Sequence, residues 1–197
     1  MNKNKISCAL LCSSLLLTAN AATAGDFKPL VRMGLDSGGD DLITVVYSGG
    51  ETADIKAGQL FTFAGGIMYH PEATNYAVEA TIGYKFDKAN ATNGTVEFTR
   101  MPIDLIASYR NENHRIGAGL TYHLSPELTC EISAICSGNV NFSDAQGFVI
   151  QYGYEFETLT GSILDIGVRY TSIDYEMEGI SGEVDGSAPG IFVSFAF

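Results

Sequence analysis

His123 and Ser125 are the two residues of this sequence whose types and spacing could support nucleophilic catalysis. A serine hydroxyl becomes a nucleophile when an imidazole within hydrogen-bond reach takes its proton, and a third group usually orients the imidazole. Glu127 and Glu131 lie nearby, but no spacing fixes either of them as that third group. Whether the pair can act on a substrate therefore depends on the element that carries it.

The residues around this pair alternate between apolar and polar or small types, as in a β-strand with two different faces. The same alternation occurs in eight segments: 29–36, 59–69, 76–86, 100–110, 116–124, 148–156, 163–171 and 191–197. Such segments of about ten residues are typical of transmembrane β-barrels, in which apolar side chains face lipid and polar or small ones face the lumen. On this pattern both His123 and Ser125 are expected to face the lumen.

The connections between these segments fall into two classes. The links 71–74, 111–114 and 157–160 are short, whereas the links 37–54, 87–95, 125–144 and 172–187 are long and polar. Short periplasmic turns that alternate with long external loops are typical of outer-membrane barrels. The sequence therefore predicts an all-β fold, an eight-stranded antiparallel up-and-down transmembrane β-barrel, although 42–47 in the first long link is itself strand-like.

The N-terminal residues resemble an export signal. Lys3 and Lys5 precede a mostly apolar stretch at 6–19, and Ala22-Thr23-Ala24 has the small residues that precede a cleavage site. A retained membrane anchor is disfavoured because a spanning helix needs about 20 apolar residues. We expect residues 1–24 to be a signal peptide and residues 25–197 to form the barrel domain.

Cys130 and Cys136 are the two cysteines left after removal of the signal, which carries Cys8 and Cys12 without the neighbours of a lipoprotein signal. A cysteine pair in an exported chain favours a disulfide in the oxidising periplasm. A zinc site would need three or four ligands, and no histidine lies near the pair. We expect a disulfide, no metal and no cofactor.

The last segment ends in Phe195 and Phe197, which share a strand face with Ile191 and Val193. This resembles the C-terminal strand of bacterial outer-membrane proteins, whose final aromatic residue is read by the barrel-assembly machinery. The sequences of segments 115–126 and 82–85 also resemble strand-and-turn sequences of the OmpA/OmpX type of small outer-membrane barrels. The resemblance covers the mature chain and implies a location in the bacterial outer membrane, in contact with its lipid and lipopolysaccharide. Because that group includes adhesins, membrane-stabilising proteins, small pores and lipid-modifying enzymes, it selects no single function.

The inward positions of the expected strands carry charges of both signs. A barrel of eight strands is about wide enough for side chains to fill it, so these charges are expected to form a paired structural network. The network residues are Arg32, Glu79, Lys85, Arg100, Asp104, Glu155, Asp165 and Arg169. Paired carboxylates for acid–base catalysis are the less favoured interpretation, because no nucleophile or cleft accompanies them.

A catalytic role for His123 and Ser125 is also disfavoured. Outer-membrane lipid A deacylases carry a similar pair with an acid, but such an enzyme must present its site to lipid and not to the lumen. We therefore expect no catalytic residues in this chain.

The excess of acidic residues lies mostly in the long links, where we expect the specific interactions of this chain. Without the signal, nine basic residues stand against 23 acidic ones, a net charge of −14, which argues against nucleic-acid binding. Most of these acids fall in the long links, where they solvate the loops or attract divalent cations or a basic surface ligand. We expect a non-enzymatic outer-membrane protein that acts in surface interaction or envelope integrity. A narrow passive pore and a lipid-modifying enzyme are the alternatives.

Overall fold

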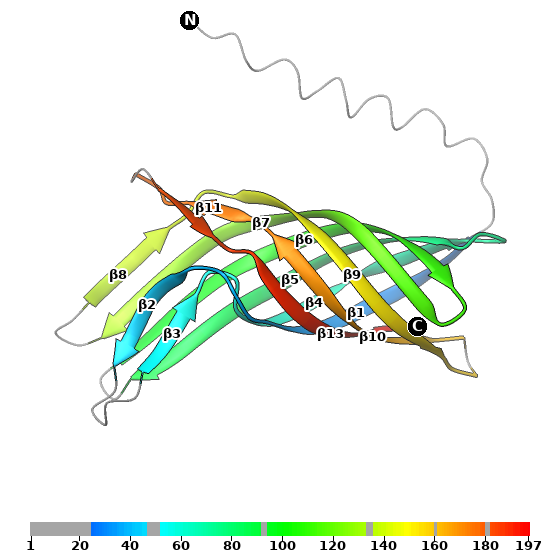
Figure 1. Cartoon of the computed structure of the whole chain (residues 1–197), viewed down its shortest axis with the longest axis horizontal. Coiled ribbons are helices and arrows are strands. Elements are labelled where there is room, and N and C mark those ends of the chain that lie inside the picture. The colour runs from blue at the N-terminus through cyan, green and yellow to red at the C-terminus, as the bar shows by residue number, and fades with distance from the viewer. Residues whose placement is uncertain (1–24, 47–51, 92–93, 133–135, 160, 180–181) are drawn as a thin grey trace, which may run out of the picture.

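The computed structural model describes residues 25–197 except 47–51, 92–93, 133–135, 160 and 180–181, and Figure 1 shows its elements. Eight strands form a closed antiparallel ring, because β1 pairs with both β4 and the last strand, β13. The barrel strands are β1 (Gly25–Asp36), β4 (Leu60–Pro71), β5 (Tyr76–Ala91), β6 (Gly94–Asn111), β7 (His114–Ile132), β9 (Ala145–Glu157), β10 (Ile163–Ser172) and β13 (Ala188–Ala196). The predicted fold class and strand number are confirmed.

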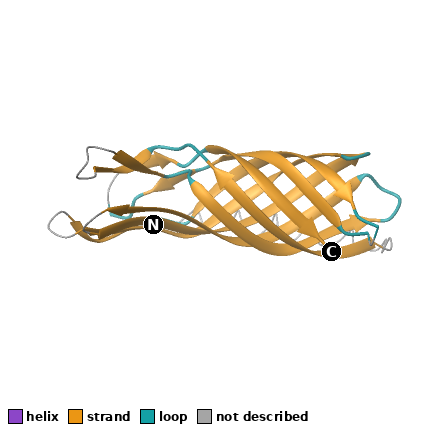
Figure 2. Cartoon of the chain, turned by 90° about the horizontal axis from the view of Figure 1, so that it is seen from below, coloured by secondary structure: helices purple, strands orange, loops and turns teal. Residues whose placement is uncertain are grey.

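Five shorter strands lie at the end of the barrel opposite the short turns (Figures 1 and 2). They are β2 (Asp41–Val46), β3 (Thr52–Lys56), β8 (Cys136–Asn141), β11 (Asp174–Glu176) and β12 (Glu183–Asp185). β2 pairs with β3, β11 pairs with β12, and β8 pairs with the outer part of β7. The expectation that the long links are loops is therefore wrong over most of their described length.

The outer face of the barrel is apolar. Ile116 and Phe148 are 64% and 65% exposed, and every barrel strand carries other large apolar side chains that are exposed. Aromatic pairs such as Phe27–Tyr69 and Tyr76–Tyr109 lie at the end with the short turns, where barrels carry an aromatic girdle. No helix in the described part of the chain is long and apolar enough to cross a membrane.

The inner face changes character along the barrel, as β6 shows. Arg100, Asp104 and Ser108 point inward in the middle of the strand, whereas Val96 and Phe98 point inward nearer its start. The inward apolar residues beyond Arg100 form a buried cluster with the short hairpins, which we call the external cap. Its members are Ile55, Ala57, Ala89, Val96, Phe98, Cys130, Ile132, Phe142, Ala145, Ile173, Tyr175 and Val184.

A β-bulge in β7 marks the start of the external cap. Met101 pairs with Leu124 and Thr99 pairs with Glu127, so β7 has one more residue than β6 between these pairs. Ser125 lies in this bulge with a φ of 47°, in the left-handed region. The extra residue reverses which face each later side chain of β7 takes.

Candidate functional site

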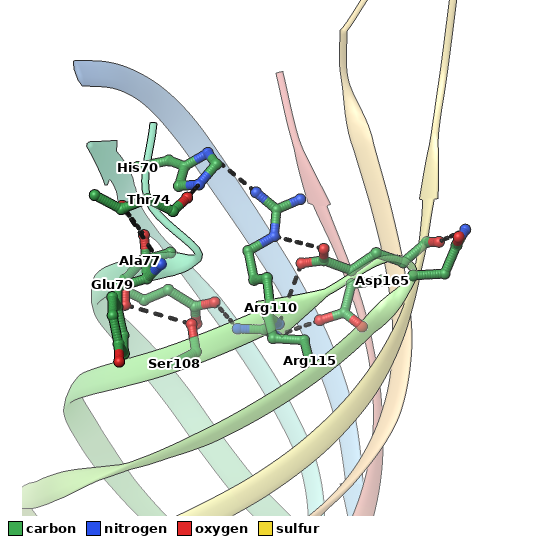
Figure 3. A network of polar contacts seen from close by, with 11 residues as sticks. His70, Thr74, Ala77, Glu79, Ser108, Arg110, Arg115 and Asp165 are labelled. Atoms are coloured by element: carbon green, nitrogen blue, oxygen red, sulfur yellow. Dashed lines mark hydrogen bonds and ion pairs between the residues drawn. The ribbon is translucent and has the colours of Figure 1, made fainter. Parts of the chain in front are cut away.

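The lumen is the candidate site, and its centre is Arg115 (Figure 3). Arg115 lies on β7, and its side chain forms ion pairs with acids on opposite sides of the barrel, Glu79 of β5 and Asp165 of β10. Its Nε also lies 3.4 Å from Oε1 of Glu155. Because the side chain of Arg115 is only 1% exposed, these acids supply the compensation that a buried guanidinium needs.

The pairs around Arg115 share partners, so the lumen holds a connected ion-pair network. Arg32 approaches the second oxygen of Glu79 at 2.5 Å, and Arg110 approaches the second oxygen of Glu155 at 2.7 Å. The Arg32 guanidinium also lies over the Phe192 ring, 5.1 Å from its centroid. Each carboxylate is thereby held between two cations, whose charges offset the cost of burying it.

Two further pairs lie between Arg115 and the external cap. Nζ of Lys85 lies 2.7 Å from Asp36, and Arg169 lies 3.1 Å from Asp104, whose other oxygen accepts a hydrogen bond from Thr121. Glycines make room for such acids: a Cβ on Gly190 would lie 1.8 Å from Oδ1 of Asp36. The close approach of strand and carboxylate therefore requires a residue without a side chain.

Arg100 stands at the boundary between the charged network and the external cap. Its Nη2 donates to the carbonyl oxygen of Gln59 at 2.6 Å, and its guanidinium lies 4.5 Å from the centroid of the Phe98 ring. Among the described residues it forms no ion pair, unlike the other cations of the predicted network. A backbone acceptor and an aromatic face suit a cation that borders an apolar cluster.

A buried hydrogen bond between two side chains joins the barrel wall to the external cap. Nδ1 of His123 and the hydroxyl of Tyr175 are 2.5 Å apart, and both side chains are buried. Tyr175 belongs to β11, and its ring makes edge contacts with Phe98 and Phe142 at 5.8 and 6.3 Å between centroids. Tyr175 is therefore the centre of the seal over the lumen.

The structure brings the eight predicted network residues into one lumen but does not assemble the His–Ser pair. His123 is buried against Tyr175, whereas Ser125 is exposed because the bulge turns it outward. The expectation that Ser125 faces the lumen is wrong. Among the described residues, no group of three or more His, Cys, Asp and Glu side chains is placed to hold a metal ion.

Sequence reasoning missed Arg115, Arg110 and Asp36. Arg115 directly precedes the alternating segment and has the inward parity of Gly117, so extending the segment by one residue would have found it. Asp36 is the last residue of the expected segment 29–36 and Asp87 is the first of the long link 87–95; neither is among the expected network residues, and both are buried. Nothing in the local sequence signals Tyr175, since its role depends on a hairpin folding back over the lumen.

The outward-facing apolar band and the closed ring of eight strands decide the fold. The chain is a small outer-membrane-type β-barrel. No family model and no curated protein matches its sequence. Among solved structures it is similar to Neisserial surface protein A, with a TM-score of 0.48 and 11% identity, over 87% of this chain and 96% of that one. It is also similar to outer membrane protein AlkL in lipid bilayers, with a TM-score of 0.45 and 15% identity, over 100% of this chain and 97% of that one.

At the cap end of the barrel, Cys130 of β7 and Cys136 of β8 are joined by a disulfide. Cys130 is buried among the apolar residues of the external cap, and Cys136 packs against them. This hairpin therefore contributes to the cap, contrary to the expectation of a purely polar loop.

At the other end, Phe195 and Phe197 lie on the outer face with their ring centroids 5.8 Å apart. The backbone N–H of Phe197 donates to Pro29, which ties the end of the chain to β1. Their role as an assembly signal stays a prediction, and the signal peptide expected at 1–24 lies outside the described residues.

Proposed function

We propose that this chain is a non-enzymatic outer-membrane protein in which the barrel is a closed anchor and the external end carries the specific interaction. The observation that supports an anchor over a pore is the filling of the lumen. The ion-pair network around Arg115 occupies its middle, and the external cap around Tyr175 covers it. Buried ion pairs at this density are expected to hold side chains in place and to leave no continuous water path for ions.

The external end carries a strongly acidic surface. Its exposed carboxylates belong to Asp40, Asp41, Asp54, Glu131, Asp144, Asp174, Glu176, Glu178, Glu183 and Asp185. The two lysines described there are already paired, Lys56 with Asp41 at 2.5 Å and Lys88 with Glu97 at 3.4 Å. Such a surface attracts divalent cations or a basic partner over about 8 Å at physiological salt. Divalent cations held there would bridge the barrel to anionic lipopolysaccharide, which is the route to envelope integrity.

Proteoliposomes of neutral lipid test the acidic surface directly. We expect the wild-type barrel to bind Ca²⁺ and a decalysine peptide, and a variant with Asp174→Asn, Glu176→Gln and Glu178→Gln to bind both more weakly. The matched control is a pair of single variants, Glu178→Gln on the acidic surface and Glu72→Gln in the turn between β4 and β5, both at exposed positions. Equal loss in these two variants would mean that total charge matters and that the external surface has no specific role.

Two further measurements separate the alternatives. The wild-type barrel should show no unitary conductance in planar bilayers, and steady conductance would favour the narrow pore. Hydrolysis of a lipid ester that is abolished by His123→Ala would instead favour the lipid-modifying enzyme.

A further inference from the structure

The end of the barrel with the short turns contains a polar pocket of about 400 Å³ that the proposed function does not use. Its charged lining comes from β1, β4, β6, β9 and the turn after β6: Lys28, His70 and Arg110, together with Asp26, Glu112 and Glu157. Pockets for small ligands have volumes of about 300 to 1,000 Å³. The opposite end is covered by the external cap, so this pocket opens on the side of the chain termini.

Arg110 forms a fixed cationic floor for the pocket. Its Nε contacts Glu155 at 2.7 Å, its Nη1 lies 3.2 Å from Nδ1 of His70, and its backbone N–H donates to Asn75 (Figure 3). Nε2 of His70 lies 2.9 Å from the carbonyl oxygen of Thr74, so Nε2 carries the proton and Nδ1 accepts from Arg110. The other terminal nitrogen of Arg110 has no partner among the described residues.

Lys28 supplies a second held cation. Its ammonium donates to the carbonyl oxygen of Gly161 at 2.8 Å and lies 2.9 Å from Asp26. The side chains of Lys28 and Arg110 are only 18% and 15% exposed, whereas that of Asp26 is 61% exposed, and Glu112 and Glu157 are exposed as well. The cations therefore lie deep in the pocket, and the acids surround its rim.

We propose that this pocket binds an amino-acid or short-peptide zwitterion, with its carboxylate on Arg110 and Lys28 and its ammonium at the acidic rim. Charge-assisted hydrogen bonds from a guanidinium to a carboxylate are strong and directional, and a guanidinium held in place beforehand loses little entropy on binding. A purely anionic ligand would meet repulsion from Asp26, Glu112 and Glu157 as it entered. The proposal rests on the proposed function only for the side of the membrane that the pocket faces, which is the periplasm.

The experiment is calorimetric titration of the folded, detergent-solubilised barrel with alanyl-alanine, its C-terminal amide and its N-acetyl form. The free dipeptide should bind, and the amide should bind about tenfold more weakly or worse, as expected for the loss of a charged hydrogen bond. Arg110→Gln should weaken the free dipeptide by a similar factor. Glu72→Gln is the matched control, since Glu72 is exposed in the turn between β4 and β5, whose Thr74 and Asn75 line the pocket, but does not itself line it.

Each outcome bears on the proposal. A folded barrel is expected to run differently on a detergent gel before and after boiling, because its closed hydrogen-bond ladder resists detergent until it is heated. If Arg110→Gln fails to fold by this criterion, Lys28→Met replaces it, because Lys28 lies outside the ion-pair network around Arg115. Equal binding of the dipeptide and its amide, or no binding to a folded wild-type barrel, would overturn the pocket and leave the external surface untouched. If the wild-type barrel binds the dipeptide but the external triple variant binds Ca²⁺ as strongly as the wild type does, the result counts against the proposed function and leaves the pocket proposal standing.

Discussion

Arg115→Met tests whether the ion-pair network holds the barrel together. The substitution leaves Glu79 with Arg32 and Glu155 with Arg110, so the loss falls chiefly on Asp165, whose ion pair in the structure is with Arg115. Leaving one buried charge uncompensated costs about 3 to 5 kcal/mol. We expect a decrease of that size in the free energy of unfolding, measured by urea titration of the barrel in lipid vesicles.

The double variant Arg115→Met with Asp165→Asn separates lost charge compensation from lost packing. Removing the orphaned charge should restore about half or more of the stability, since replacing both partners of a buried pair is often nearly neutral. Lys88→Met is the control: Lys88 is exposed and pairs with Glu97 at 3.4 Å, so its loss should cost about 1 kcal/mol or less. If the two substitutions add their costs, or if Arg115→Met costs no more than the control, the network does not stabilise the barrel as we argue.

Three other substitutions have expected outcomes. Phe197→Ala should reduce the amount of assembled barrel in the outer membrane more than its stability, and normal assembly levels would exclude the signal role. Gly190→Ala should destabilise the barrel in urea titrations by about 1 to 3 kcal/mol, because the new methyl group displaces the Asp36 carboxylate. Cys130→Ser should leave barrel unfolding almost unchanged but make the hairpin more sensitive to protease. In intact wild-type cells, an impermeant thiol reagent should label Cys130 and Cys136 only after reduction, and labelling without a reductant would exclude the disulfide.

The sequence predicted the barrel wall well because the membrane imposes one rule on every strand. In 101–109 of β6, the odd-numbered positions are apolar and exposed, and Asp104 and Ser108 face inward. No break in this alternation of outward apolar and inward residues is long enough to remove a strand from the count, so the number of strands followed from the alternation alone. Most of the inward charges followed as well. Arg115 was missed because the expected segment 116–124 begins one residue too late, and Arg110 and Asp36 were missed at the ends of the segments 100–110 and 29–36.

The extent of the strands could not be predicted by the same rule, because the alternation reverses beyond the membrane. In β6, Glu97 and Thr99 continue the outer face as polar residues, while Val96 and Phe98 continue the inner face as apolar ones. A search for apolar side chains on the outside ends where this reversal begins, and the remaining residues look like a polar loop. The reversed pattern is itself a signal for strands that continue into water around an apolar centre.

This reversal also explains why the two ends of the lumen differ. From Arg100 toward the cap end, the inner face is apolar and is covered by Tyr175 and its hairpin. This end therefore closes by the burial of apolar side chains away from water. At the other end the strands stop at turns of a few residues, too short to fold back over the lumen, and Arg110 and Lys28 remain within reach of solvent. The lumen of a barrel built this way is accessible from one end only. The end covered by the cap offers a charged surface, and the end with the short turns offers a pocket.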